Sequence, residues 1–212
     1  MGQRGVVGHH LLIAGEVVVG MLGVPPPRNT AVSADTPTVS GVHADRDAER
    51  RSRFEEVFRA HHRSIARFVA ARYPTVDGGD LVALTFEVAW RRLDDAPIEA
   101  VRGWLCGIAR NHARNAIRQR GRQRRLAGAL ATDLSGGVSW LHDERLPFEV
   151  AERLAAALGQ LSEADRETIE LAAFAGLSGA DLGAALGVSA GAASVRLHRA
   201  RQRLADFYEV GR

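Results

Sequence analysis

Along most of the chain after residue 50, apolar positions recur with the spacing of amphipathic helices. From Phe54 to Val69 they follow the i, i+3, i+4, i+7 rule, and residues 81–93 are apolar around most of a helical circumference. A third segment, residues 104–125, has one apolar stripe that can face a core. The stripe consists of Leu105, Ala109, Ala113 and Ile117. The pattern predicts three helices that form one domain over residues 51–125.

A second periodic region starts at Phe148. Between the two regions, residues 126–147 mix Gly, Ser and acidic residues without sustained periodicity, which indicates a flexible linker in which Trp140 could dock on a domain surface. Four helical segments then follow, over 148–161, 163–176, 179–187 and 190–208. The fold class is therefore all-α, with two small helical domains, and the second spans residues 148–212.

Polar residues and glycines mark where these helices begin and end. Residues that favour helix N-caps precede four of the segments: Asp80, Ser162, Ser178 and Ser189. Gly176 and Gly187 are expected to end two of them. The last two segments, joined by a turn that contains Gly187, are typical of a helix-turn-helix.

Arginine dominates the charge of the third helical segment. The chain has a net charge of +3 and contains no lysine, so all 28 basic residues are arginine. Eight of them lie between Glu99 and Asp133 with no carboxylate among them, and Arg110, Arg114, Arg118 and Arg122 recur every four residues. A helix with a buried side and a row of guanidinium groups on another side is suited to a polyanion. A solvated basic face is the alternative, but the second basic helix downstream favours nucleic acid.

That second basic helix is the last segment. The chain has no acidic residue from Leu182 to Ala205, and within the last segment Ala193, Leu197, Ala200 and Leu204 are spaced for a core. A recognition helix reads base edges mainly with its N-terminal residues, and arginines further along hold phosphates. Ser194 and His198 share another face with neighbouring arginines.

Several motifs occur in the order found in bacterial sigma factors of the extracytoplasmic-function (ECF) type, which residues 53–206 resemble. FEEVFRAHHRSIARFVAARY (54–73) resembles the first helix of sigma region 2, and DLVALTFEVAWRRL (80–93) the helix that binds the clamp of RNA polymerase. WLCGIARNHARNAIRQR (104–120) is similar to the helix that opens and reads the minus-ten element. The segment 161–204, which includes RLHRAR, is similar to region 4.

The resemblance implies three sets of site residues. Polymerase would be bound by Asp80, Leu81, Thr85, Phe86 and Trp90. The minus-ten element would be bound by Arg110, Asn111, Arg114, Asn115, Arg118 and Arg120, with Asn111 helping to hold a flipped base. The minus-35 element would be bound by Ser189, Ser194, Arg196, His198 and Arg199.

The implied partners are core RNA polymerase, through its clamp and flap, and promoter DNA. The resemblance also admits an anti-sigma factor as a partner. It implies neither catalysis nor a cofactor nor a metal, and it places the protein in the cytoplasm, away from membranes.

The chain departs from the family pattern at two places. Ala83-Leu84 stands where the family usually has Gln-Glu after DLV, so a polar and an acidic group are missing from the expected polymerase face. GAASVRLHRAR stands where many members have GTVKSRLHRAR, so Ala192 and Ser194 replace Thr and Lys. We therefore expect weak or unusual promoter selectivity.

Two other classes of function remain. An autonomous helix-turn-helix regulator would have no need of the apolar surface over 80–93. An enzyme could use the pairs Asp77/Asp80, Asp94/Asp95 or His61/His62, but no nucleophile–base pair, phosphate loop or HExxH spacing accompanies them. Capping and surface charge explain these acidic residues, and adjacent histidines on a helix point about 100° apart.

The single cysteine and the N-terminal 50 residues add two further expectations. The single cysteine, Cys106, excludes an intramolecular disulfide and is expected to be a small buried residue. Residues 1–50 contain an apolar run interrupted by His9, His10 and Glu16, followed by a Pro/Ser/Thr/Ala-rich stretch. They predict a disordered extension without assigned function, and a translation start at Met21 or later is an alternative.

Overall fold

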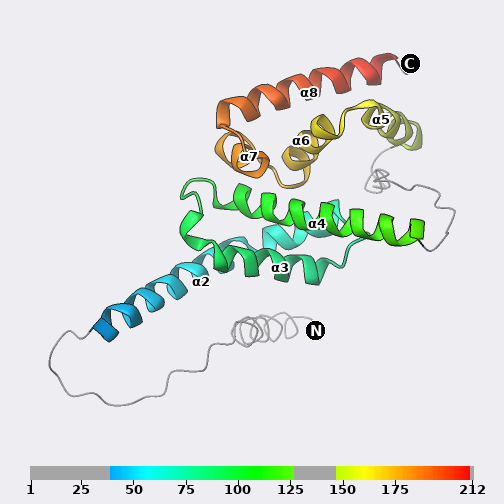
Figure 1. Ribbon diagram of the computed structural model, residues 1–212. Helices are drawn as coiled ribbons and strands as arrows, with labels where there is room; N and C mark the ends of the chain where they lie inside the picture. The colour runs from blue at the N-terminus through cyan, green and yellow to red at the C-terminus, as the bar shows by residue number, and fades with distance from the viewer. Residues whose placement is uncertain (1–38, 127–146, 211–212) are drawn as a thin grey trace, which may run out of the picture. The chain divides into compact units, whose positions relative to one another are not determined.

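The computed structural model describes residues 39–126 and 147–210, and every regular element in these ranges is a helix (Figure 1). The first range contains α2 (Val39–Arg72), α3 (Gly78–Arg91), a short 3₁₀ helix η1 (Leu93–Asp95) and α4 (Val101–Leu126). The second contains α5 (Phe148–Gln160), α6 (Glu163–Phe174), α7 (Gly179–Leu186) and α8 (Ala190–Val210). The expected all-α fold is confirmed.

Helices α2, α3 and α4 enclose one apolar core. Aromatic rings join α2 to α3: Phe54 packs edge-on against Trp90, with ring centroids 5.2 Å apart, and Phe58 lies 4.8 Å from Phe86. On α4 the predicted stripe is buried at its first three positions and opens at the fourth, where Ile117 is 43% exposed. The core of this part is built from Phe54, Ile65, Phe68, Val69, Leu81, Phe86, Leu93, Leu105, Ala109 and Ala113.

A second apolar cluster joins α5, α6 and α8. Leu158 and Leu161 pack with Leu204 and Phe207, which ties α5 to the C-terminal half of α8. The residues of α8 that were spaced for a core, Ala193, Leu197 and Ala200, are buried, and Leu204 is partly buried. The turn between α7 and α8 depends on glycine, because Gly187 has φ +70° and a Cβ on Gly183 would lie 2.8 Å from the carbonyl oxygen of Val188. These two helices form the expected helix-turn-helix.

The helix boundaries confirm most of the expected caps. Ser162 accepts a hydrogen bond from the Asp165 amide, Ser189 accepts one from the Ala192 amide, and Gly187 ends α7 in the left-handed conformation. Gly176 follows the end of α6 with φ +61°. Ser178 occupies the N-cap position of α7 but makes no side-chain capping bond.

Two expected boundaries are wrong. The N-cap of α3 is Asp77, whose side chain accepts from the Asp80 amide, and Asp80 lies in the first turn of the helix. Helix α2 begins at Val39, so residues 39–50 are helical where the sequence predicts disorder. Arg50 accounts for part of this extension: its guanidinium donates to the carbonyl of Trp90 at 2.8 Å and lies 4.9 Å from that ring. The remainder of the predicted extension and linker, with Trp140, lies outside the described residues.

The described helices include none that is long and apolar enough to span a membrane.

Candidate nucleic-acid interface

The basic surface of α4 divides into a free part and a paired part. Arg118, Arg120, Arg122, Arg124 and Arg125, near the C-terminal end of the helix, are exposed. Arg118 donates to the Asn115 side chain at 2.6 Å, and Arg120 donates to the carbonyl of Thr75. Neither partner is a carboxylate, so both guanidinium groups keep their full charge for an anion.

The paired part lies one to two turns nearer the N-terminus. Arg114 is 2.7 Å from a carboxylate oxygen of Glu163 and 3.3 Å from Glu167, and Arg110 is 3.5 Å from Glu167. Both acidic residues belong to α6. The Arg110 guanidinium also donates to the side-chain oxygen of Asn111, which is exposed. Two of the residues expected at the minus-ten element are therefore engaged by carboxylates, and Asn111 remains accessible.

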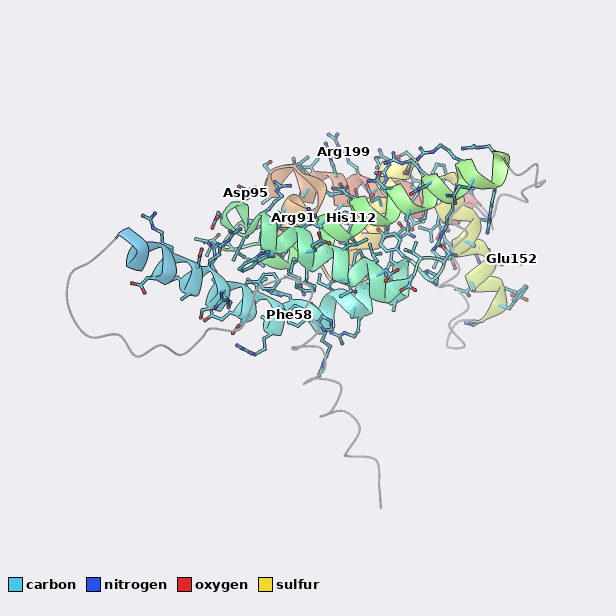
Figure 2. All side chains as sticks on the ribbon, turned by 60° about the horizontal axis from the view of Figure 1, so that its bottom comes forward. Phe58, Arg91, Asp95, His112, Glu152 and Arg199 are labelled. Carbon is cyan, nitrogen blue, oxygen red and sulfur yellow. The ribbon has the colours of Figure 1, made fainter. Side chains whose placement is uncertain are left out.

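The helix-turn-helix presents its expected contact residues to solvent. Ser189, Ser194, Arg196, His198 and Arg199 are all exposed, and Arg199 projects from α8 (Figure 2). The Ser189 oxygen caps the helix, and the Ser194 hydroxyl donates to the carbonyl of Ala190 at 3.0 Å. Ser194 thus uses its proton inside the helix, whereas the lysine usual at this place would extend a charge. Of the expected contact residues, Arg196, His198 and Arg199 are therefore the ones whose polar groups remain available to DNA.

Helix α3 places the expected polymerase-binding residues in two environments. Leu81, Thr85 and Phe86 are at most 3% exposed, and the Thr85 hydroxyl donates to the carbonyl of Leu81. Asp80 is exposed and Trp90 is partly exposed. The outward surface of this helix also contains Ala83, Leu84 and Glu87, and Leu84 is 43% exposed. Of the expected polymerase-binding residues, therefore, Asp80 and Trp90 are accessible to a partner, whereas Leu81, Thr85 and Phe86 belong to the core.

Three of the side chains considered for enzyme chemistry have structural roles. Asp77 caps α3, and Asp95 is paired with Arg92 at 3.0 Å. The His62 ring packs 4.7 Å from that of Phe58, and burial lowers the pKa of this histidine. Burial also lowers the pKa of His61. As expected, Cys106 is buried, and burial raises the pKa of its thiol to about 12, which leaves it protonated and unreactive at neutral pH.

Sequence reasoning missed a group of contacts that join α2 and α4 to α6 and α7. The Gly103 amide donates to Asp181 of α7 at 2.9 Å, Arg102 lies 3.3 Å from the same carboxylate, and Arg72 of α2 lies 2.5 Å from Glu170 of α6. One signal was present in the sequence. Gly103 and Gly107 stand four residues apart on α4, the spacing of a face that another helix backbone can approach closely.

Comparison with known proteins identifies the two helical parts. A family model described as "Sigma-70 region 2" matches residues 57–123, and one described as "Sigma-70, region 4" matches residues 151–204. The RNA polymerase sigma factor CnrH of Cupriavidus metallidurans is 39% identical over 147 residues, which cover 65% of this chain and 76% of CnrH. The ECF RNA polymerase sigma factor SigE of Mycolicibacterium smegmatis is 32% identical over 136 residues, 62% of this chain and 51% of SigE. The chain belongs to the ECF sigma factors.

Two solved structures of sigma factors are also similar. One is CnrH in complex with the cytosolic domain of CnrY, at 30% identity and a TM-score of 0.47, covering 74% of this chain and 88% of that one. The other is the sigma factor RpoE in complex with the anti-sigma factor NepR from Bartonella quintana, at 25% identity and a TM-score of 0.47, covering 79% and 99%. In this sigma factor, region 2 covers the C-terminal part of α2, all of α3 and most of α4. Region 4 covers α6 and α7 and most of α5 and α8.

Proposed function

We propose that this sigma factor uses three binding surfaces: α3 binds core RNA polymerase, α4 binds the minus-ten element, and α8 binds the minus-35 element. The observation that carries the proposal is the order of the two sigma regions together with the row of guanidinium groups on α4, which no acidic residue interrupts. Phosphates attract such a row at long range and hold it by bidentate hydrogen bonds.

At the minus-ten element, Asn111 and the arginines of α4 have different tasks. The exposed amide of Asn111 can hydrogen-bond a base edge, whereas Arg118 and Arg120 follow the backbone of the separated strand. A base is held there only after it is unstacked, which costs a few kcal/mol and makes the capture selective. Asn115 orients Arg118 through their 2.6 Å hydrogen bond.

At the minus-35 element, α8 offers few side chains that can read bases. Arg196, His198 and Arg199 are exposed, Ala192 has no polar group, and the Ser194 proton is used inside the helix. Arginine on a guanine edge gives about 1–3 kcal/mol of discrimination, and a serine gives less directional contact. We therefore expect minus-35 recognition that depends strongly on these arginines and tolerates sequence changes elsewhere.

The polymerase contact is assigned to the exposed residues of α3. Asp80, Ala83, Leu84, Glu87 and Trp90 are accessible to different degrees, with Leu81, Thr85 and Phe86 packed behind them. Leu84, which replaces an acidic residue of the family pattern, adds an apolar side chain to this surface. An apolar contact at its centre would compensate for the lost charge.

The remaining expectations follow from membership of the family. The sigma factor acts in the cytoplasm as a transcription initiation factor without catalysis of its own. The resemblance to the family also leads us to expect an anti-sigma factor as a partner of this chain. A stand-alone regulator is not favoured, since such a protein has no use for a polymerase-binding α3.

The test is binding of the full chain to bacterial core RNA polymerase, measured by co-elution in size-exclusion chromatography. Leu84→Arg should reduce binding at least tenfold, because it places a charge at the centre of the surface while leaving the core behind it intact. Phe148→Arg is the matched control: this residue is 76% exposed on α5, and its replacement should leave binding unchanged. Full binding by the Leu84→Arg chain would refute the assignment of α3.

A further inference from the structure

Ion pairs between regions 2 and 4 in the described residues all have the same polarity. In each pair the arginine belongs to α2 or α4 and the carboxylate to α6 or α7. The pairs are Arg72–Glu170, Arg102–Asp181, Arg110–Glu167, Arg114–Glu163 and Arg114–Glu167, at 2.5–3.5 Å. Region 4 thus presents an acidic side to the basic side of region 2.

The helix backbones also fit closely at this contact. A Cβ on Gly103 would lie 1.9 Å from the carbonyl oxygen of Asp181, and one on Gly107 would lie 3.1 Å from that of Ala185. The Asp181 carboxylate accepts from the Gly103 amide, an amide in the first turn of α4 that has no partner within its own helix. Glycine at position 103 is therefore required by the approach of α7, since α4 alone would be more stable with alanine there.

Several charged side chains at this contact are more buried than those of ordinary surface ion pairs. The side chain of Glu170 is 5% exposed, and those of Arg110 and Glu167 are 13% and 18% exposed. Desolvation raises the pKa of Glu170 even with Arg72 beside it. A carboxylate buried in this way needs its arginine, so the contact is specific to this pairing of the two regions.

We propose that region 4 inhibits DNA binding by region 2 within the same chain, because Glu163 and Glu167 occupy the guanidinium groups of Arg110 and Arg114 in place of DNA phosphates. A carboxylate and a phosphate use the same forked donors, so one arginine cannot serve both fully. DNA then competes with region 4, and the regions must separate before α4 engages the minus-ten strand. The proposal rests on the proposed role of these arginines at that element.

The pair that holds Arg114 is weak enough to exchange its carboxylate for a DNA phosphate. Arg114 and Glu163 are 38% and 74% exposed, and ion pairs of this kind contribute little individually. The apparent affinity for DNA is reduced by the fraction of chains that are open. If roughly one chain in ten is open, complete opening raises the affinity about tenfold.

A charge variant tests the competition directly. Glu163→Gln with Glu167→Gln removes both carboxylates and leaves every arginine in place. The full-length variant should bind a fluorescein-labelled single-stranded oligonucleotide of random sequence about threefold to tenfold more tightly, measured by anisotropy. The matched control is Glu149→Gln with Glu152→Gln, which makes the same charge change on exposed residues of α5, where Glu152 projects outward (Figure 2). The control variant should gain much less affinity for the oligonucleotide, because it loses two negative charges without freeing an arginine of α4.

A steric variant tests the closure without changing charge. Gly103→Ala should separate α4 from α7, lower the sedimentation coefficient and tighten oligonucleotide binding to a similar extent. Gly121→Ala, on the same helix with no atom within 4 Å of the added methyl group, should change neither property. Far-ultraviolet circular dichroism confirms that both variants retain their helices.

The outcomes separate this proposal from the function on which it rests. If the wild type binds DNA through Arg118 but the charge and steric variants match it in both sedimentation and affinity, the internal inhibition is refuted. If the steric variant opens but neither it nor the wild type binds the oligonucleotide, the assignment of α4 to DNA is refuted, and inhibition falls with it.

Discussion

Replacing Arg118 by glutamine should weaken DNA binding in a way that depends on salt. Arg118 is exposed on α4, and its partner among the described residues is the neutral side chain of Asn115, so its charge is available to a phosphate. One phosphate contact on single-stranded DNA changes the slope of log K against log salt concentration by about 0.7. Over a fourfold rise in salt, from about 50 to about 200 mM, that one contact is worth about 2.5-fold in affinity.

The assay is anisotropy with a labelled single-stranded oligonucleotide at several salt concentrations. The Arg118→Gln chain should bind more weakly than the wild type at low salt, and the difference should shrink by about 2.5-fold at the highest concentration. Arg59→Gln, an exposed arginine on α2, is the control and should leave the slope unchanged. A loss that is equal at all salt concentrations, or an equal effect of Arg59→Gln, would refute the phosphate contact.

Two further predictions concern the core of region 2. Leu105→Ala should lower the free energy of unfolding by about 2–5 kcal/mol in urea titrations, because Leu105 is fully buried. Ile117→Ala, on the same predicted stripe, should lower it by less than about 1 kcal/mol. Equal losses for the two variants would contradict the packing of α4. Cys106 should resist iodoacetamide at neutral pH until the chain is unfolded. Rapid alkylation of the native chain would contradict the burial of this thiol. Because burial raises its pKa to about 12, the folded state binds the thiol proton more tightly than the unfolded state does. The free energy of unfolding should therefore fall as the pH rises above the ordinary thiol pKa.

Much of the fold could be predicted because it depends on local patterns. Apolar periodicity located the helices, and cap chemistry located Ser162, Ser189, Gly176 and Gly187 at the ends of three of them. Where local signals competed, the prediction was wrong. Asp77 and Asp80 are both good capping residues three positions apart, and only the folded geometry selects Asp77.

The site was less predictable because its contacts are remote in sequence. Periodicity alone makes Arg110, Arg114 and Arg118 equivalent, but the structure pairs the first two with carboxylates about 50 residues away and leaves Arg118 free. Leu81, Thr85 and Phe86 match the motif of a binding helix, yet they are buried, because a helix that is apolar around most of its circumference must also face its own core. The motif predicts which helix binds a partner, and burial shows which residues of that helix a partner can reach.

This ECF sigma factor should direct core RNA polymerase to promoters. The most direct measurement is transcription in vitro by bacterial core RNA polymerase with the full chain, on fragmented genomic DNA, with the 5′ ends of the transcripts mapped. We expect start sites that appear only with the chain present and share a minus-ten and a minus-35 element. The Arg118→Gln chain should yield fewer transcripts from these sites. Transcripts no different from those of core polymerase alone, made with a correctly folded chain, would contradict this expectation.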